Sequence, residues 1–126
     1  MRKALAILGF AILILAVSAL QFHKHSELQA EKQRNSFCEM FELAKALESD
    51  LSSVGELPDQ LSGSTSVLAL NGTQPCVGEM QLVDGNFLDP WGRPYSYQII
   101  DNSSAILEDS LGKKIFIGLG EVQILL

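Results

Sequence analysis

The sequence predicts an α+β protein in which one long N-terminal helix packs on a three- or four-stranded antiparallel sheet. Three observations predict this class. Residues 10–54 contain neither proline nor glycine. The second half of that stretch repeats apolar residues at three- and four-residue steps, which makes one apolar helix face. Residues 95–126 hold short β-branched and aromatic runs between turn residues, as in an antiparallel meander.

Length and charge exclude several classes of protein. The chain has 126 residues and a net charge of −6, enough for one domain of roughly 100 residues beside the N-terminal segment. Residues 1–34 carry five basic and two acidic side chains, whereas residues 35–126 carry four basic and thirteen acidic ones. An acidic domain without a basic stripe argues against nucleic-acid binding. A Rossmann or barrel enzyme core does not fit this length.

Residues 1–22 predict a membrane anchor or a signal segment. Arg2 and Lys3 precede an apolar run that covers residues 4–20, and a span of the bilayer core needs about 17–25 residues. The run is long for a cleaved signal, which favours the anchor. Residues 17–19, Val-Ser-Ala, would nevertheless serve as a cleavage site, so the secreted alternative stays open. Both alternatives export the acidic part.

Residues 23–54 predict a stem helix that continues from this segment without a break. Its apolar stripe consists of Phe37, Met40, Phe41, Leu43, Ala44, Leu47 and Leu51. The helix should end near Val54-Gly55, since Pro58 follows. We expect Glu39, Glu42 and Glu48 to form a solvated face off that stripe. Both histidines lie in the stem, so no Ser-His-Asp or Cys-His arrangement is predicted.

Residues 55–87 read as an irregular loop, with a helical turn or short strand at 67–70. Cys38 on the stem and Cys76 in this loop are the only cysteines. In an exported chain such a pair predicts a disulfide, and this one would tie the loop to the helix. We expect strands at 95–100, 105–108 and 114–117, with a fourth strand or a tail at 121–126. The striped helix face would cover their apolar side.

Residues 88–97 are the most informative stretch. Asp89 and Pro90 predict a turn in which the carboxylate accepts backbone N–H bonds. Gly92 permits a positive φ, and Pro94 leads into the next strand. Tyr95 and Tyr97 should share one face of the sheet. The one tryptophan, Trp91, would anchor the turn against the helix.

These residues resemble the Asp-Pro-Trp-Gly-x-Pro-Tyr-x-Tyr signature of the major pseudopilin of bacterial type II secretion. The match covers Asp89, Pro90, Trp91, Gly92, Pro94, Tyr95 and Tyr97, and Leu119-Gly120-Glu121 is loosely similar to a later segment of that family. The resemblance implies a pilin-like lollipop. Residues 1–22 would lie in the inner membrane, and residues 23–126, with the stem 23–54, the loop 55–87 and the β-region 88–126, would form a periplasmic head.

The chain departs from that family at two places. Gly9-Phe10 is followed by Ala-Ile-Leu-Ile rather than Thr-Leu-Ile-Glu, so Ile14 replaces the glutamate that pairs inside the family's filaments. We therefore expect neither processing at Gly9 nor ordinary polymerisation. The resemblance also implies a calcium loop, but Glu121 is the one acid after Gly120, and Glu108 and Asp109 are the nearest others. We expect no cofactor or metal, with calcium as the family-based alternative.

The function expected from these residues is structural. The chain would be an accessory pseudopilin-like component of a secretion or pilus-type system, contacting other envelope proteins and the membrane. The alternative is a periplasmic or secreted protein-binding module with a cleaved signal. No catalytic constellation or small-molecule site is visible in the sequence, so we do not expect an enzyme.

Overall fold

The computed structural model describes residues 2–125, with the side chains of all of these except residues 2–6, 20, 22 and 23. One long helix, α1 (Arg2–Val54), precedes two antiparallel sheets, which confirms the α+β class. The chain divides into two compact units, one up to Lys32 and one from Gln33 onward. Met1 and Leu126, at the outer ends of the predicted anchor and fourth strand, lie outside the described residues.

The first unit consists of helix alone. It exposes large apolar side chains along one stretch, including Ile7, Phe10 and Leu15. Its most apolar 18-residue window has a mean hydropathy of 1.8, so the helix is long and apolar enough to cross a membrane. A signal sequence meets the same criterion, and the two alternatives for residues 1–22 both stand.

In the second unit, α1 supplies one wall of the core. Met40, Leu43, Ala44, Leu47 and Leu51 are buried there. The predicted stripe is thereby confirmed at its centre, while Phe37 and Phe41 are half-buried. The helix ends as predicted, since Gly55 takes a φ of +90° and its N–H donates to the Leu51 carbonyl at 3.0 Å.

A four-stranded antiparallel sheet supplies the facing wall. Its strands are β3 (Ser96–Asp101), β4 (Ser104–Glu108), β5 (Lys114–Gly118) and β6 (Glu121–Leu125), paired in chain order. The three predicted strands are confirmed within one residue at each boundary, and residues 121–125 form the fourth strand rather than a tail. Ala105, Leu107, Ile115 and Ile117 point toward the helix and are buried. β3 carries an irregularity between Ile99 and Asp101, whereas β6 pairs with β5 without interruption.

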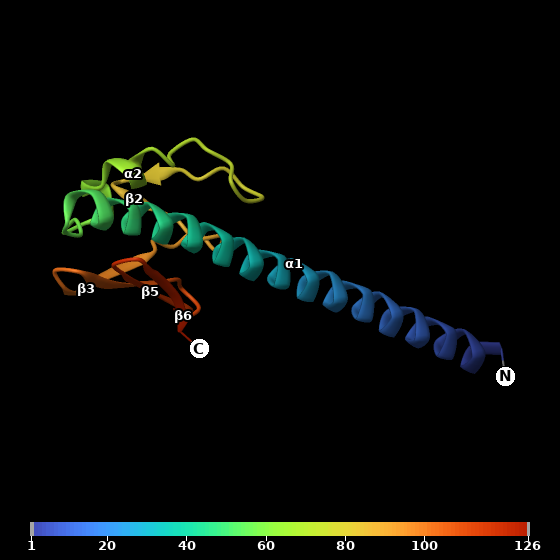
Figure 1. The fold of residues 1–126 in the computed structure, drawn as a ribbon. Helices are drawn as coiled ribbons and strands as arrows, with labels where there is room; N and C mark the ends of the chain where they lie inside the picture. The colour runs from blue at the N-terminus through green and yellow to red at the C-terminus, as the bar shows by residue number, and fades with distance from the viewer. Residues whose placement is uncertain (1, 126) are drawn as a thin grey trace. The chain divides into compact units, whose positions relative to one another are not determined.

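The segment between helix and sheet is more ordered than predicted. It holds a 3-10 turn η1 (Leu61–Gly63), a one-turn helix α2 (Thr65–Leu68) and a hairpin of β1 (Leu82–Val83) with β2 (Asn86–Phe87). Figure 1 shows α2 and β2 on the opposite side of α1 from β3, β5 and β6. Leu61, Val67 and Phe87 are buried in the same core cluster as the helix stripe. The C-terminal half of α1 is therefore covered on two sides.

Candidate functional site

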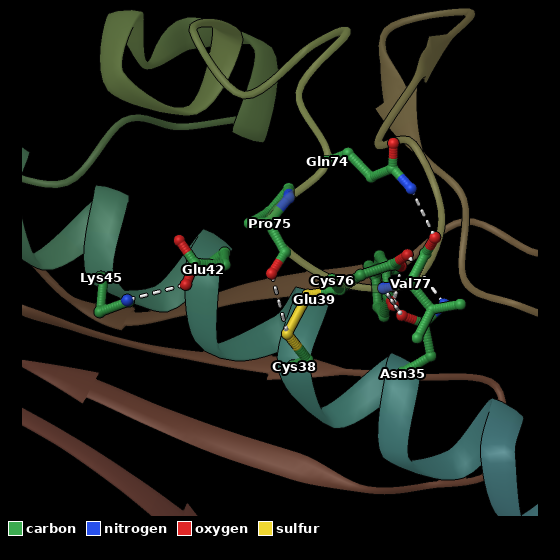
Figure 2. Close-up of a disulfide and its surroundings, with 10 residues drawn as sticks. Asn35, Cys38, Glu39, Glu42, Lys45, Gln74, Pro75, Cys76 and Val77 are labelled. Atoms are coloured by element: carbon green, nitrogen blue, oxygen red, sulfur yellow. Dashed lines mark hydrogen bonds and ion pairs between the residues drawn. A yellow bond between two sulfur atoms is a disulfide. The ribbon is translucent and has the colours of Figure 1, made fainter.

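The predicted disulfide is present. Cys38 on α1 and Cys76 in the loop are joined, with their Cα atoms 6.0 Å apart. Figure 2 shows the bridge beside Pro75, whose carbonyl oxygen lies 3.9 Å from the Cys38 sulfur. The bridge thus fastens the loop to the helix. Between Leu70 and Met80 the loop has no buried apolar side chain that could pack against the helix.

Further hydrogen bonds hold this loop, which we call the tethered loop (residues 71–79). The Val77 N–H donates to Asn35 Oδ1 at 3.1 Å, one helical turn before the bridge. Two backbone hydrogen bonds join the two ends of the loop. Gly72 N–H donates to the Met80 carbonyl, and Met80 N–H donates to the Thr73 carbonyl. The loop is fixed although nearly all of it is exposed, and Val77 is 67% exposed.

The turn at residues 89–93 forms as predicted around the Asp89 carboxylate. Asp89 Oδ1 accepts N–H bonds from Trp91 and Arg93, each at 3.0 Å. Gly92 takes a φ of +81°, which lets the chain turn back so that Asp89 N–H donates to the Arg93 carbonyl at 2.7 Å. Asp89 Oδ2 accepts a third N–H bond, from Ser110 at 3.0 Å.

A second turn lies beside the first, at residues 109–113. The sequence predicts a turn between strands there, but its repetition of the construction at 89–93 was not predicted. Asp109 Oδ1 accepts the N–H groups of Leu111 and Lys113 at 3.0 Å, and Gly112 has a φ of +85°. The shared pattern, Asp-x-x-Gly followed by a basic residue, occurs at 89–93 and at 109–113 and could have revealed it. We call the pair the twin turns. The Ser110 N–H bond to Asp89 joins them directly.

Hydroxyl groups connect this region to α1. Ser36, which is fully buried, donates to Asp109 Oδ2 at 2.8 Å. The Tyr95 hydroxyl donates to Glu39 Oε2 at 2.8 Å, and the Tyr97 hydroxyl donates to the Pro58 carbonyl at 2.7 Å. The two tyrosines therefore share the helix-facing side of the sheet, as predicted.

Glu39 departs from the prediction of a solvated helix face. Its side chain is buried, because Tyr95 and Asn35 both turn toward it. Of the other two glutamates in that prediction, Glu42 pairs with Lys45 at 2.8 Å and Glu48 accepts the Gly120 N–H at 3.1 Å. Helical spacing alone did not distinguish Glu39 from these, since its partner is 56 residues away in the chain.

Burial and hydrogen bonding change the acidity of these groups in opposite directions. Burial raises the pKa of Glu39, and the bond from Tyr95 only partly offsets it. Burial also opposes ionisation of Asp89, but hydrogen bonds from Ser110, Arg93 and Trp91 together outweigh it and lower the pKa. Burial raises the pKa of Tyr95, and it raises the pKa of Tyr97 to about 12. Both phenols are therefore neutral donors at pH 7.

Trp91, the expected anchor of the turn, lies outside the buried core cluster. It is half-buried and is not among the core residues or those packed against them. Phe87 and Tyr95, on either side of the turn, are buried in the core instead. The Asp89 carboxylate fixes the backbone of the turn.

The residues do not fit the calcium loop that the family resemblance implies. Both oxygens of Asp109 already accept protein hydrogen bonds, and Leu119-Gly120 form a tight two-residue turn before Glu121 enters β6. Calcium needs six to eight oxygen ligands. Among the side chains that the structure describes, no group of three His, Cys, Asp or Glu is placed to hold a metal. The buried Asp89 and Asp109 accept backbone N–H groups, which is a structural role.

Comparisons of the chain with protein-family models, with curated proteins and with solved structures found no significant match.

Proposed function

We propose that the chain is a pseudopilin-like structural component of a bacterial secretion or pilus-type envelope system. Its N-terminal helix would anchor it in the inner membrane, and its disulfide-bonded head would contact other envelope proteins in the periplasm. We infer an accessory role from position 14. In the pseudopilin family that the sequence resembles, a glutamate there pairs with a neighbouring subunit's N-terminal amine in the filament core, whereas this chain has Ile14. An unpaired N-terminal amine in an apolar core would be costly.

One observation carries this proposal: three residues of the family signature make the contacts that hold the sheet region to its surroundings. Asp89 closes the turn, and Tyr95 and Tyr97 bond across to α1 and to the segment after it. The signature residues therefore build a head in which a sheet packs on the end of one long helix. None of them presents a nucleophile or an acid–base pair, which supports a non-enzymatic role.

The alternative is a secreted or periplasmic protein-binding module with a cleaved signal. The observation that favours it is the tethered loop, because a rigid exposed loop that adds nothing to the core is typical of recognition surfaces. The two candidates differ in what happens to residues 1–22.

Mass spectrometry of the N-terminus of the protein from its native membranes tests the proposal. An intact Met1 is the expected result for the anchored accessory component. A chain that begins at Leu20 would support the secreted module instead. A methylated N-terminal Phe10 would contradict the accessory assignment, since it would show pilin-type processing. Crosslinking in intact envelopes would then identify the partner proteins.

A further inference from the structure

The four-stranded sheet has two open edges. Among the described residues, β3 pairs only with β4 along its length and β6 only with β5. Natural proteins protect such edges with proline, lysine or bulges. β3 has one irregularity, near its end at Ile100, whereas β6 contains neither lysine nor proline and has no bulge.

Both edges also leave apolar side chains partly uncovered on the helix-facing side. Ile99 on β3 is 37% exposed and Ile124 on β6 is 42% exposed, although their neighbours Ala105 and Ile115 on the central strands are buried. The cause is geometric. Strands lie about 4.8 Å apart and a helix is about 10 Å wide, so one helix covers roughly two strands of four.

The two edges are complementary in direction. In an antiparallel sheet of four strands the first and last strands run in opposite directions, so β3 and β6 are antiparallel to each other. Two copies held side by side in the same orientation therefore bring β6 of one against β3 of the other in antiparallel alignment. The second copy is related to the first by a translation across the strands and the small rotation of a twisted sheet, so neither copy has to be inverted.

The side chains are complementary in one register. With Gln123 opposite Gln98 of the second copy, Val122 faces Ile99 and Ile124 faces Tyr97 on the helix-facing side. Glu121 then faces Ile100, so no like charges are opposed. A slip by one residue would set apolar side chains of one copy against the glutamine face of the other.

We propose that β6 of one copy pairs with β3 of a second copy of this chain, with Gln123 opposite Gln98. The contact extends the sheet from one head into the next and covers Ile99 and Ile124. It goes beyond the proposed function and uses no residue of the N-terminal helix. Membrane anchoring enters only as a means of giving neighbouring copies one orientation.

Cysteine crosslinking of the full-length protein in detergent tests the pairing. Gln98→Cys and Gln123→Cys proteins are prepared separately and treated with a short bismaleimide, alone and mixed. Cys38 and Cys76 are bonded to each other and do not react. We expect a crosslinked dimer in the mixture and none in either single variant. A mixture of Glu56→Cys with Gln123→Cys, which places one cysteine on an exposed site off the sheet, is the control and should not crosslink.

Charge substitutions at the same two sites give a second measurement that does not depend on crosslinking. The double variant Gln98→Glu/Gln123→Glu should weaken self-association in sedimentation by roughly two- to fivefold, as expected for opposed like charges across strands. Gln98→Lys/Gln123→Glu should restore it. The proposal is overturned if the mixture does not crosslink, if a single variant crosslinks with itself, or if both double variants behave alike. None of these results bears on the N-terminal mass, so the proposed function is tested separately.

Discussion

At the scale of single residues, carboxylates organise the head by accepting backbone N–H groups. Asp89 and Asp109 each accept two such bonds within their own turn and a third bond from outside it. This role suits a carboxyl group on a short stem. Hydrogen bonds to a carboxylate stabilise its charge, which explains why Asp89 is buried and yet has a lowered pKa.

Replacement of Asp89 by asparagine should destabilise the head by about 2–3 kcal/mol, because an amide cannot accept all three N–H bonds and brings donors of its own. Chemical unfolding followed by near-ultraviolet circular dichroism measures this. Asp84→Asn is the matched control, since Asp84 lies in an exposed turn at a φ of 51° that asparagine also tolerates. An Asp89→Asn protein as stable as this control would show that the carboxylate bonds are dispensable.

Glu39 should make stability depend on pH in the opposite sense from Asp89. Its pKa is raised in the folded protein, so its favourable contribution is complete below the unfolded value of about 4.5 and is lost as pH rises through the folded pKa. Glu39→Gln keeps an acceptor for the Tyr95 hydroxyl and does not ionise. We therefore expect the stability of this variant relative to wild type to increase between about pH 4 and pH 7. A constant or decreasing difference over that range would contradict the assignment.

At the scale of elements, the sequence predicted the features whose positions depend on local periodicity. The helix stripe, the helix end at Val54 and the four strands follow from spacing and from turn residues, and the structure confirms them. The β1–β2 hairpin was missed, although Asp84-Gly85 with positive φ at both residues is a known hairpin signal. The strands that flank it are too short to show alternation.

The rest of the segment could not be predicted from spacing, because its shape depends on partners far along the chain. Asp50 on α1 accepts the hydroxyl groups of Ser64 and Ser66, which fixes the start of α2. Asn35 and Cys38 fix the tethered loop. Burial of Glu39 likewise depends on Tyr95. The sequence alone paired Cys38 with Cys76, since the chain has no other cysteine. It did not indicate which groups Asn35 and Asp50 would bond to.

The disulfide should be the largest single contribution from the loop segment. It closes a separation of 38 residues, which corresponds to about 4 kcal/mol in the chain-entropy model. We expect the double variant Cys38→Ser/Cys76→Ser to lose about that much stability and to expose residues 71–79 to proteolysis first. The reduced wild-type protein is the control and should behave alike. A loss below about 1 kcal/mol would indicate that the hydrogen bonds alone hold the loop.

At the scale of the whole molecule, the two units differ in how far their side chains are exposed. All of the buried core residues belong to the unit from Gln33 onward, whereas the described side chains before Lys32 are almost entirely exposed. An apolar helix that exposes its large side chains needs a different environment from an acidic head with a closed core. The two parts should therefore respond independently to substitution.

Two variants test this independence. Leu47→Ala leaves a cavity in the core and should lower head stability by about 2–5 kcal/mol, while the protein stays in the membrane fraction after an alkaline wash. Leu13→Arg places a charge in the apolar run, at a cost of about 2.5–3.5 kcal/mol for insertion, and should remove protein from that fraction. Leu13→Ala, which keeps the run apolar, is the control. In detergent, the heads of both Leu13 variants should unfold as wild type does, because none of the side chains described before Gln33 belongs to the core. If Leu13→Arg also lowers head stability, the two units are coupled through the helix that joins them.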